Sequence, residues 1–217
     1  MYNKITNKLL TLMNKVYGNK NEISLGLARK KGLNSSLKTI QKELNKLSKK
    51  ETSSLYKEME SYYLNGYLDT ADTTRKPIKK SKDKSRHPWS GMNAGQRINM
   101  HSTKYMRELT SGIENLIRKG ASRASVITFI VATGDKYSDR LATLYRTELW
   151  HMEREGVLDG MKYNKVKFIE YVTRRDNRVC PECQALEEYN DGIYPIEDAP
   201  ILPRHPHCRC VHIPHEK

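Results

Sequence analysis

Apolar residues recur three or four positions apart over the first 70 residues, a spacing that predicts helices. One helix is expected over residues 5–16, after which Gly18 interrupts the pattern. A longer helix is expected over residues 33–68. Lysines occupy much of the polar face of each helix. Helices this polar bury little surface alone, so we expect them to pack on each other, on the rest of the chain, or on a partner.

The next seventy residues predict three more helices. The first is expected over residues 103–119, with Ser102 as its N-cap. The second covers residues 122–132 and ends at Gly134, although its β-branched content would also suit a strand. The third spans residues 138–156. Together they predict a central helical bundle.

After Gly160 the pattern changes to alternation, which predicts a strand over residues 165–173 and a short closing strand over residues 209–213. The expected fold class is therefore α+β and mostly helical, with N-terminal helices, a central bundle and a small β-containing C-terminal lobe held by zinc. We expect an N-terminal helical region over residues 1–70, a basic linker over residues 71–87 and a C-terminal domain over residues 88–214. Within that domain, the zinc lobe is expected to cover about 165–214.

Charge adds information about partners. The chain carries 39 Lys+Arg against 25 Asp+Glu, a net charge of +14, and its mean hydropathy is -0.78. Such an excess favours a polyanion such as nucleic acid, although a solvated basic surface gives the same composition. The N-terminus lacks the pattern of a signal peptide, and no stretch approaches the roughly 18 apolar residues that span a membrane. We therefore expect a soluble chain that is not secreted.

The segment from residue 75 to residue 86 holds seven basic residues and one acid. It contains Pro77 and lacks large apolar groups, so it is expected not to order itself. It is either a solvated linker or a flexible arm that touches phosphates. The candidate phosphate contacts are Arg75, Lys76, Lys79, Lys80, Lys82, Lys84 and Arg86.

The strongest chemical signal is a cluster of cysteines and histidines. All four cysteines lie between positions 180 and 210, as a C-x2-C pair followed by a C-x-C pair. Close-spaced thiols in a reducing compartment are typical of a tetrahedral zinc site. We favour a structural zinc ion held by the four cysteines. His205 is the first alternative ligand. The cysteines are Cys180, Cys183, Cys208 and Cys210. A disulfide, or reduced cysteines without a metal, remain alternatives.

A catalytic interpretation is weaker. A catalytic zinc keeps a position open for water, and four thiolates leave none. No close pair of an acid and a histidine stands out as a general base. We expect no enzymatic activity.

Several motifs occur in a characteristic order along residues 88–214. They are Pro88-Trp89-Ser90-Gly91, Arg146-Thr147-Glu148, Asp176-Asn177-Arg178-Val179-Cys180-Pro181-Glu182-Cys183, and Pro203-Arg204-His205-Pro206-His207-Cys208-Arg209-Cys210. This order resembles the phage head morphogenesis family, the Mu protein F-like minor head proteins. One departure is a glycine expected soon after Ala185-Leu186 that arrives only at Gly192, which predicts a longer loop.

The resemblance implies a minor component of a bacteriophage head. Its partners would be the portal and other head proteins, with packaged DNA as a possible contact and no membrane. Its location would be the virion, and the host cytoplasm during assembly. A zinc-dependent nucleic-acid-binding protein or nuclease is the alternative, and a toxin-type effector is a more distant one.

The Arg-Thr-Glu motif lies in the middle of a predicted helix. We expect Arg146 and Glu148 to hold this helix to the C-terminal lobe through charge-assisted hydrogen bonds, with Asp176 as the partner of Arg146.

Overall fold

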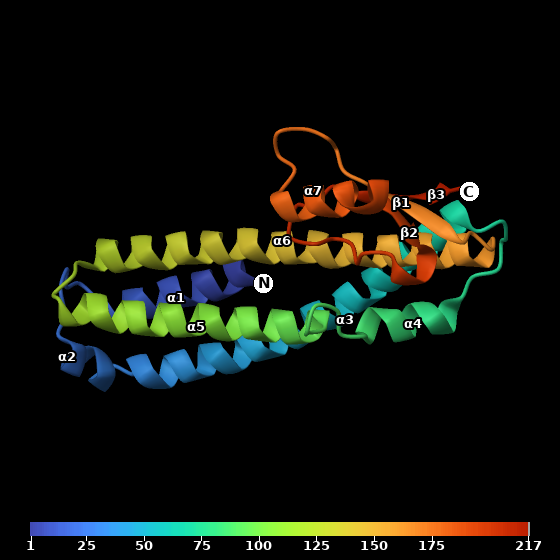
Figure 1. The fold of residues 1–217 in the computed structure, drawn as a ribbon. Helices are drawn as coiled ribbons and strands as arrows, with labels where there is room; N and C mark the ends of the chain where they lie inside the picture. The colour runs from blue at the N-terminus through green and yellow to red at the C-terminus, as the bar shows by residue number, and fades with distance from the viewer. Residues whose placement is uncertain (217) are drawn as a thin grey trace. The chain divides into compact units, whose positions relative to one another are not determined.

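The computed structural model describes residues 1–216, and most of them are helical (Figure 1). The α-helices are α1 (Tyr2–Tyr17), α2 (Leu25–Lys30), α3 (Leu33–Thr70), α4 (Ile78–Arg86), α5 (Ala94–Arg118), α6 (Arg123–Tyr163) and α7 (Pro181–Glu188). The strands are β1 (Phe168–Val172), β2 (Ile193–Pro195) and β3 (Val211–His215), with 3-10 turns η1 (Tyr189–Gly192) and η2 (Ile196–Asp198). The expected α+β, mostly helical class is confirmed.

One compact unit comprises Met1–Ser53 and Ser90–Ala142. Its core contains apolar faces of α1, α3, α5 and α6, together with buried tyrosine rings. The rings of Tyr2 and Tyr105 meet edge to face at 4.5 Å, and the Tyr2 hydroxyl is hydrogen-bonded to Nδ1 of His101 at 2.6 Å. Tyrosine thus supplies the aromatic packing of a chain with only two Phe.

Helix α5 begins nine residues before the expected position of 103. Asn93 caps it by accepting the backbone N–H of Gln96, whose side chain accepts the backbone N–H of Asn93 in return. Ser102, expected to be the cap, lies inside the helix, buried, with its hydroxyl 2.7 Å from that of Ser48.

Helix α6 is one continuous element, so the break expected at Gly134 is wrong. A Cβ atom at Gly134 would lie 2.4 Å from Oγ1 of Thr6. The glycine therefore permits close approach of α1 and does not end the helix.

The second unit comprises residues 54–89 and 143–216. Here α3 and α6 pack backbone against backbone: a Cβ at Gly156 would lie 2.1 Å from the carbonyl oxygen of Tyr63, and one at Gly66 would lie 2.2 Å from that of Glu153. Gly156, where the sequence predicted the helix to end, is therefore an interior residue that makes this crossing possible.

The basic segment provides a further correction, because residues 78–86 form helix α4 and are not an unstructured linker. The small side chains of Ser81 and Ser85 are buried, which lets α4 pack closely. Ion pairs with α3 and α6 replace the missing apolar contacts. These pairs are Lys80–Asp159, Lys84–Glu155 and Arg86–Glu60. The domain boundaries expected at residues 70 and 87 stay predictions.

The three strands form an antiparallel sheet in the order β2-β1-β3. Strand β1 pairs Phe168 with His215 and Val172 with Val211, and it buries Ile169 and Tyr171. Figure 1 shows this sheet and α7 beside the C-terminal part of α6, which contributes Val157 and Met161 to the same core (Figure 1). The late glycine of the sequence follows two left-handed residues, Asn190 and Asp191, in the turn between α7 and β2.

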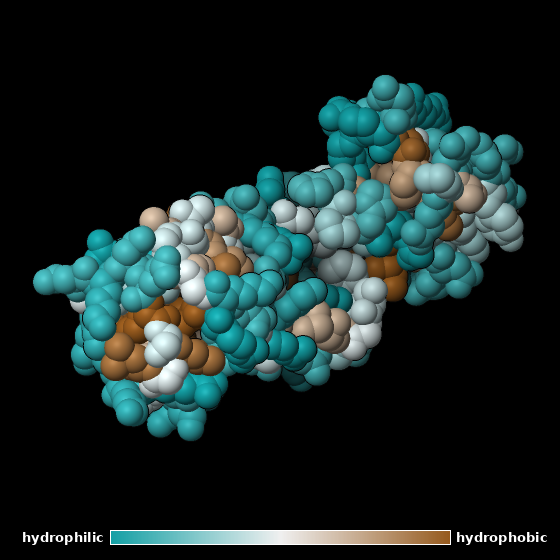
Figure 2. All heavy atoms as spheres, turned by 90° about the vertical axis from the view of Figure 1, so that its left-hand side faces the viewer, coloured by the Kyte–Doolittle hydropathy of each residue, from teal (hydrophilic) through white to brown (hydrophobic). Residues whose placement is uncertain are grey.

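Polar side chains cover most of the face seen in Figure 2, and hydrophobic ones gather in separate patches (Figure 2). Within residues 1–216, no helix is both long enough and apolar enough to cross a membrane.

Candidate metal centre and adjoining pocket

The C-x2-C pair is positioned by the start of helix α7. Cys180 is the N-cap residue and Pro181 occupies the first turn, where a missing N–H costs nothing. The backbone N–H of Cys183 donates to Sγ of Cys180 at 3.4 Å. The first turn of α7 therefore brings the two sulfurs together on one side.

The segment before β3 brings the remaining donors. Nε2 of His205 lies 3.2 Å from Sγ of Cys180 and 3.5 Å from Sγ of Cys183. The sulfurs of Cys183 and Cys208 are 3.9 Å apart, and Cys210 lies within 4.8 Å of both. The structure thus gathers all five ligands that the sequence singled out.

These distances fit a tetrahedral metal ion. Zinc–sulfur bonds of about 2.3 Å and zinc–nitrogen bonds of about 2.0 Å give edges of about 3.8 Å between two sulfurs and about 3.5 Å between sulfur and nitrogen. A cavity of about 20 Å³ is lined by the four cysteines and His205. The donor set and the space between its members can hold one ion.

The orientation of the His205 ring is that of a metal ligand. Its Nδ1–H donates to the carbonyl oxygen of Pro206 at 2.8 Å, which leaves the lone pair of Nε2 directed at the sulfurs. Ligating histidines usually donate their second ring nitrogen in this way. This hydrogen bond is also the main reason that the pKa of His205 is raised.

The thiols differ in their ease of ionisation. The side chain of Cys210 donates toward Cys208 and lowers the pKa of Cys208 to about 5, while this same contact raises the pKa of Cys210. The backbone N–H of Cys183 lowers the pKa of Cys180, and burial raises the pKa of Cys183 to about 11. Cys180 and Cys208 therefore lose their thiol protons more readily than Cys183 and Cys210.

Tyr171 belongs to this centre, although the sequence analysis missed it. Its side chain is buried beside Cys183 and Cys210, and its hydroxyl has no hydrogen-bond partner among the described residues. A buried phenol next to cysteine sulfur can donate its O–H to that sulfur. Its signal in the sequence was the alternation of β1, which places Tyr171 on the same face as Ile169.

Asp176 supports the loop before the C-x2-C pair through a different arginine from the one expected. Its two carboxylate oxygens each accept from Arg209 at 2.7 Å, so the pairing with Arg146 is replaced by a bidentate pair with Arg209. The hydrogen bonds from Arg209 are the main reason that the pKa of Asp176 falls to about 2. The ion pair connects the loop before α7 directly to the C-x-C segment.

Glu148 is almost completely buried, and it accepts a hydrogen bond from Nε1–H of Trp89 at 2.8 Å. The Trp89 ring stacks on His151 at 4.2 Å, and Nδ1 of His151 lies 2.7 Å from the carbonyl oxygen of Leu202. His151, which sequence analysis did not single out, therefore contacts the segment leading to the C-x-C pair from α6.

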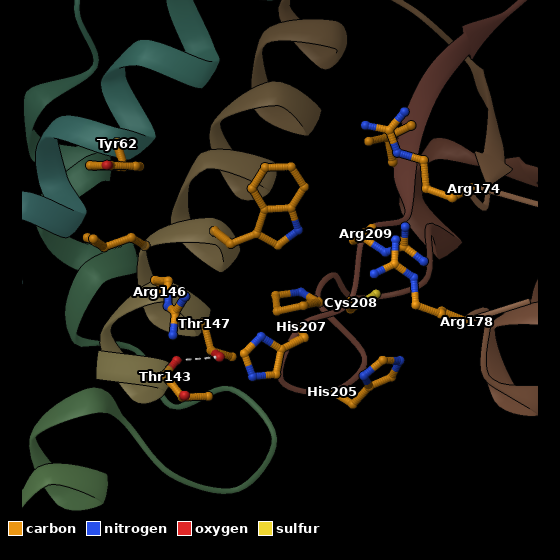
Figure 3. A pocket seen from close by; sticks show the side chains of 14 residues that line it. Tyr62, Thr143, Arg146, Thr147, Arg174, Arg178, His205, His207, Cys208 and Arg209 are labelled. Carbon is orange, nitrogen blue, oxygen red and sulfur yellow. Dashed lines mark hydrogen bonds between the residues drawn. The ribbon is translucent and has the colours of Figure 1, made fainter. Parts of the chain in front are cut away.

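A larger pocket of about 790 Å³ adjoins the cysteine cluster (Figure 3). Arg146 and Thr147 of α6 form one wall, and Arg174, Arg178 and Arg209 form the opposite wall (Figure 3). Its arginine lining did not stand out in the sequence, because the four residues come from three separate segments.

The candidate phosphate contacts of the basic segment divide into two groups. Lys80, Lys84 and Arg86 pair with carboxylates of the same unit, as described above. Arg75, Lys76, Lys79 and Lys82 are exposed and form no ion pair within residues 1–216. A role of this segment in nucleic-acid binding stays a prediction.

The fold and the centre together define a helical protein with a small Cys/His lobe able to hold a metal ion. The family model for phage Mu protein F like proteins matches residues 20–213, and the chain belongs to this family. The resemblance expected from the motifs is confirmed, and membership indicates a phage head morphogenesis protein. The chain has no significant match to a curated protein, and none to a solved structure.

Proposed function

We propose that the protein is a non-enzymatic minor head protein of a tailed bacteriophage that acts in head assembly, and in genome packaging or delivery, next to the portal. The observation that carries the proposal is the family match over residues 20–213, which includes helices α2 to α7 and the Cys/His lobe. The metal centre acts as a structural cross-link in this proposal. The portal and other head proteins are its expected partners, and the virion is its expected location.

The proposed ion is zinc, held by Cys180, Cys183, His205 and Cys208. Nε2 of His205 lies 3.2 Å from Sγ of Cys180 and 3.5 Å from Sγ of Cys183, and Sγ of Cys183 lies 3.9 Å from Sγ of Cys208. Cys210 then supports the thiolate of Cys208 from outside the coordination sphere. The set with Cys210 in place of His205 is the alternative, and metal measurements on variants distinguish the two.

A structural role follows from the number of donors. Catalytic zinc needs an open position for water, whereas five protein donors surround a cavity of only about 20 Å³ here. The lobe has few large apolar residues in its core. A metal ion that joins α7 to the segment before β3 can supply the missing stability.

The exposed cations around α4 are proposed to contact packaged DNA. Arg75, Lys76, Lys79 and Lys82 are exposed, and a chain with net charge +14 is attracted to phosphates. This contact would be independent of sequence, because lysines that touch phosphates carry no base information.

Disruption of the gene in the encoding phage, with complementation by wild-type or variant protein, tests the head role. We expect particles without the protein to form defective heads or to fail in DNA delivery, and we expect purified virions to contain it. Cross-linking in virions should recover portal peptides. Normal infectious particles without the protein would contradict the proposal, and metal-dependent cleavage of DNA by the purified chain would favour the nuclease alternative.

A further inference from the structure

The pocket beside the metal centre has a strongly cationic lining. It is lined by the side chains of Arg146, Arg174, Arg178 and Arg209, together with His205 and His207, and no Asp or Glu among residues 1–216 lines it. Asp176 compensates Arg209 and lies 3.9 Å from Arg178, so those two arginines share one carboxylate. Arg174 is exposed and has no ion pair or side-chain hydrogen bond within residues 1–216. Positive charge therefore exceeds negative charge around the pocket.

The pocket is also amphipathic. Trp150 lines it alongside the arginines, and the guanidinium of Arg154 lies 4.2 Å from the centre of the indole ring. Nε1 of Trp150 is buried and has no hydrogen-bond partner in the described part of the chain. In Figure 3 the His207 ring points across the pocket toward the α6 wall (Figure 3). Hydrogen-bond donors and apolar surface thus occur together, whereas carboxylate acceptors are missing from the lining.

This combination selects one class of ligand. Guanidinium groups match the oxygens of phosphate in a bidentate manner, and an aromatic ring beside them offers a surface for a base. A volume of about 790 Å³ lies within the range of roughly 300–1,000 Å³ that small ligands occupy. We propose that this pocket binds a phosphate-bearing nucleotide unit, as part of a nucleic-acid strand or at its end. The site goes beyond the proposed head role, because it assigns a ligand to a cavity separate from α4.

The test uses the full metal-loaded chain and a fluorescently labelled single-stranded oligonucleotide of 12 nucleotides. Arg174→Glu reverses one charge in the pocket, and Arg107→Glu reverses one charge at an exposed arginine of α5 outside it. We expect Arg174→Glu to raise the Kd about tenfold, as expected for one lost charged hydrogen bond, and Arg107→Glu to change it less than about twofold. The slope of log K against log salt should fall by about 1 for the pocket variant alone.

Three competitors identify the source of the phosphate. Competition by a nucleoside monophosphate or by inorganic phosphate indicates a terminal phosphate, whereas competition by unlabelled oligonucleotide alone indicates the diester backbone. Either result supports the proposal when the Arg174→Glu variant no longer shows that competition. Poly-glutamate that competes as well as the oligonucleotide would overturn it in favour of an acidic peptide.

Folding controls keep the test decisive. Arg174→Glu should retain the metal content and melting temperature of the wild type, and a milder Arg174→Gln variant should lie between the two in affinity. Equal loss in Arg174→Glu and Arg107→Glu, or no binding by the wild-type chain, would overturn the proposal. Neither result would affect the head role, which is tested by virion composition.

Discussion

Nε2 of His205 lies 3.2 Å from Sγ of Cys180, although 25 residues separate them. The contact joins the first turn of α7 to the segment that enters β3. We expect His205→Ala to lower the affinity for zinc by more than the roughly 10–100-fold typical of a lost outer-shell partner. Cys210→Ser, which leaves the proposed four ligands in place, should cost less than about tenfold. Competition with a colorimetric chelator measures both, and the reverse order would establish the four-cysteine site.

The backbone contact between α3 and α6 predicts a stability effect. At Gly156 a methyl group would lie 2.1 Å from the carbonyl oxygen of Tyr63. Gly156→Ala should lower the free energy of unfolding by about 1–3 kcal/mol, because the helices must separate. Gly26→Ala is the matched control, since a Cβ there meets nothing within 4 Å, and it should be neutral or slightly stabilising. Denaturant titration compares them, and equal stabilities would show that the helices are not closely packed.

Helix α4 depends on a buried carboxylate. Asp159 accepts from the Tyr63 hydroxyl at 2.6 Å and pairs with Lys80 at 2.9 Å. Asp159→Ala should cost about 1–3 kcal/mol, because it leaves the buried Tyr63 hydroxyl without its acceptor and removes the carboxylate that pairs with Lys80. Lys79→Ala removes an exposed lysine of the same helix and should change stability by less than about 0.5 kcal/mol. Accelerated amide exchange across α4 in the Asp159 variant would identify the segment that is released, and unchanged exchange would contradict this role.

This helix also shows where sequence reasoning failed. A segment without large apolar residues was expected to stay unstructured, yet its small serines and paired lysines hold it in place. The partners, Glu155 and Asp159, lie more than 70 residues away, and no local pattern announces such ion pairs. The helix ends predicted at Gly134 and Gly156 were wrong for a related reason. A glycine needed for close helix packing looks the same in sequence as one that ends a helix.

The Cys/His cluster that could hold a metal ion and the class of fold were predictable because they depend on local spacing. The C-x2-C pair requires only one turn of helix, and the alternation of β1 is visible in five residues. The bidentate pair of Asp176 with Arg209, by contrast, depends on a loop that returns after 33 residues. Sequence alone had therefore assigned Asp176 to the wrong arginine.

Acid should destabilise the N-terminal unit through His101. Burial is the main reason that its pKa falls from about 6.5 to about 4 in the folded protein, with Arg140 and Lys104 adding repulsion. Between these values the unfolded chain binds more protons than the folded chain, so stability is lost as pH falls from about 6.5 toward 4. Across this window, the melting temperature should depend less on pH for His101→Gln than for the wild type. Parallel pH profiles would exclude His101 as the cause.

Hydrogen exchange of the full chain, before and after zinc removal by a chelator, tests the structural metal centre most directly. The account predicts about one zinc per chain, with loss of protection in β1, α7 and β3 on chelation and unchanged protection in α1 and α5. Purified protein without bound metal, or a C-terminal lobe equally protected with and without zinc, would contradict the central claim.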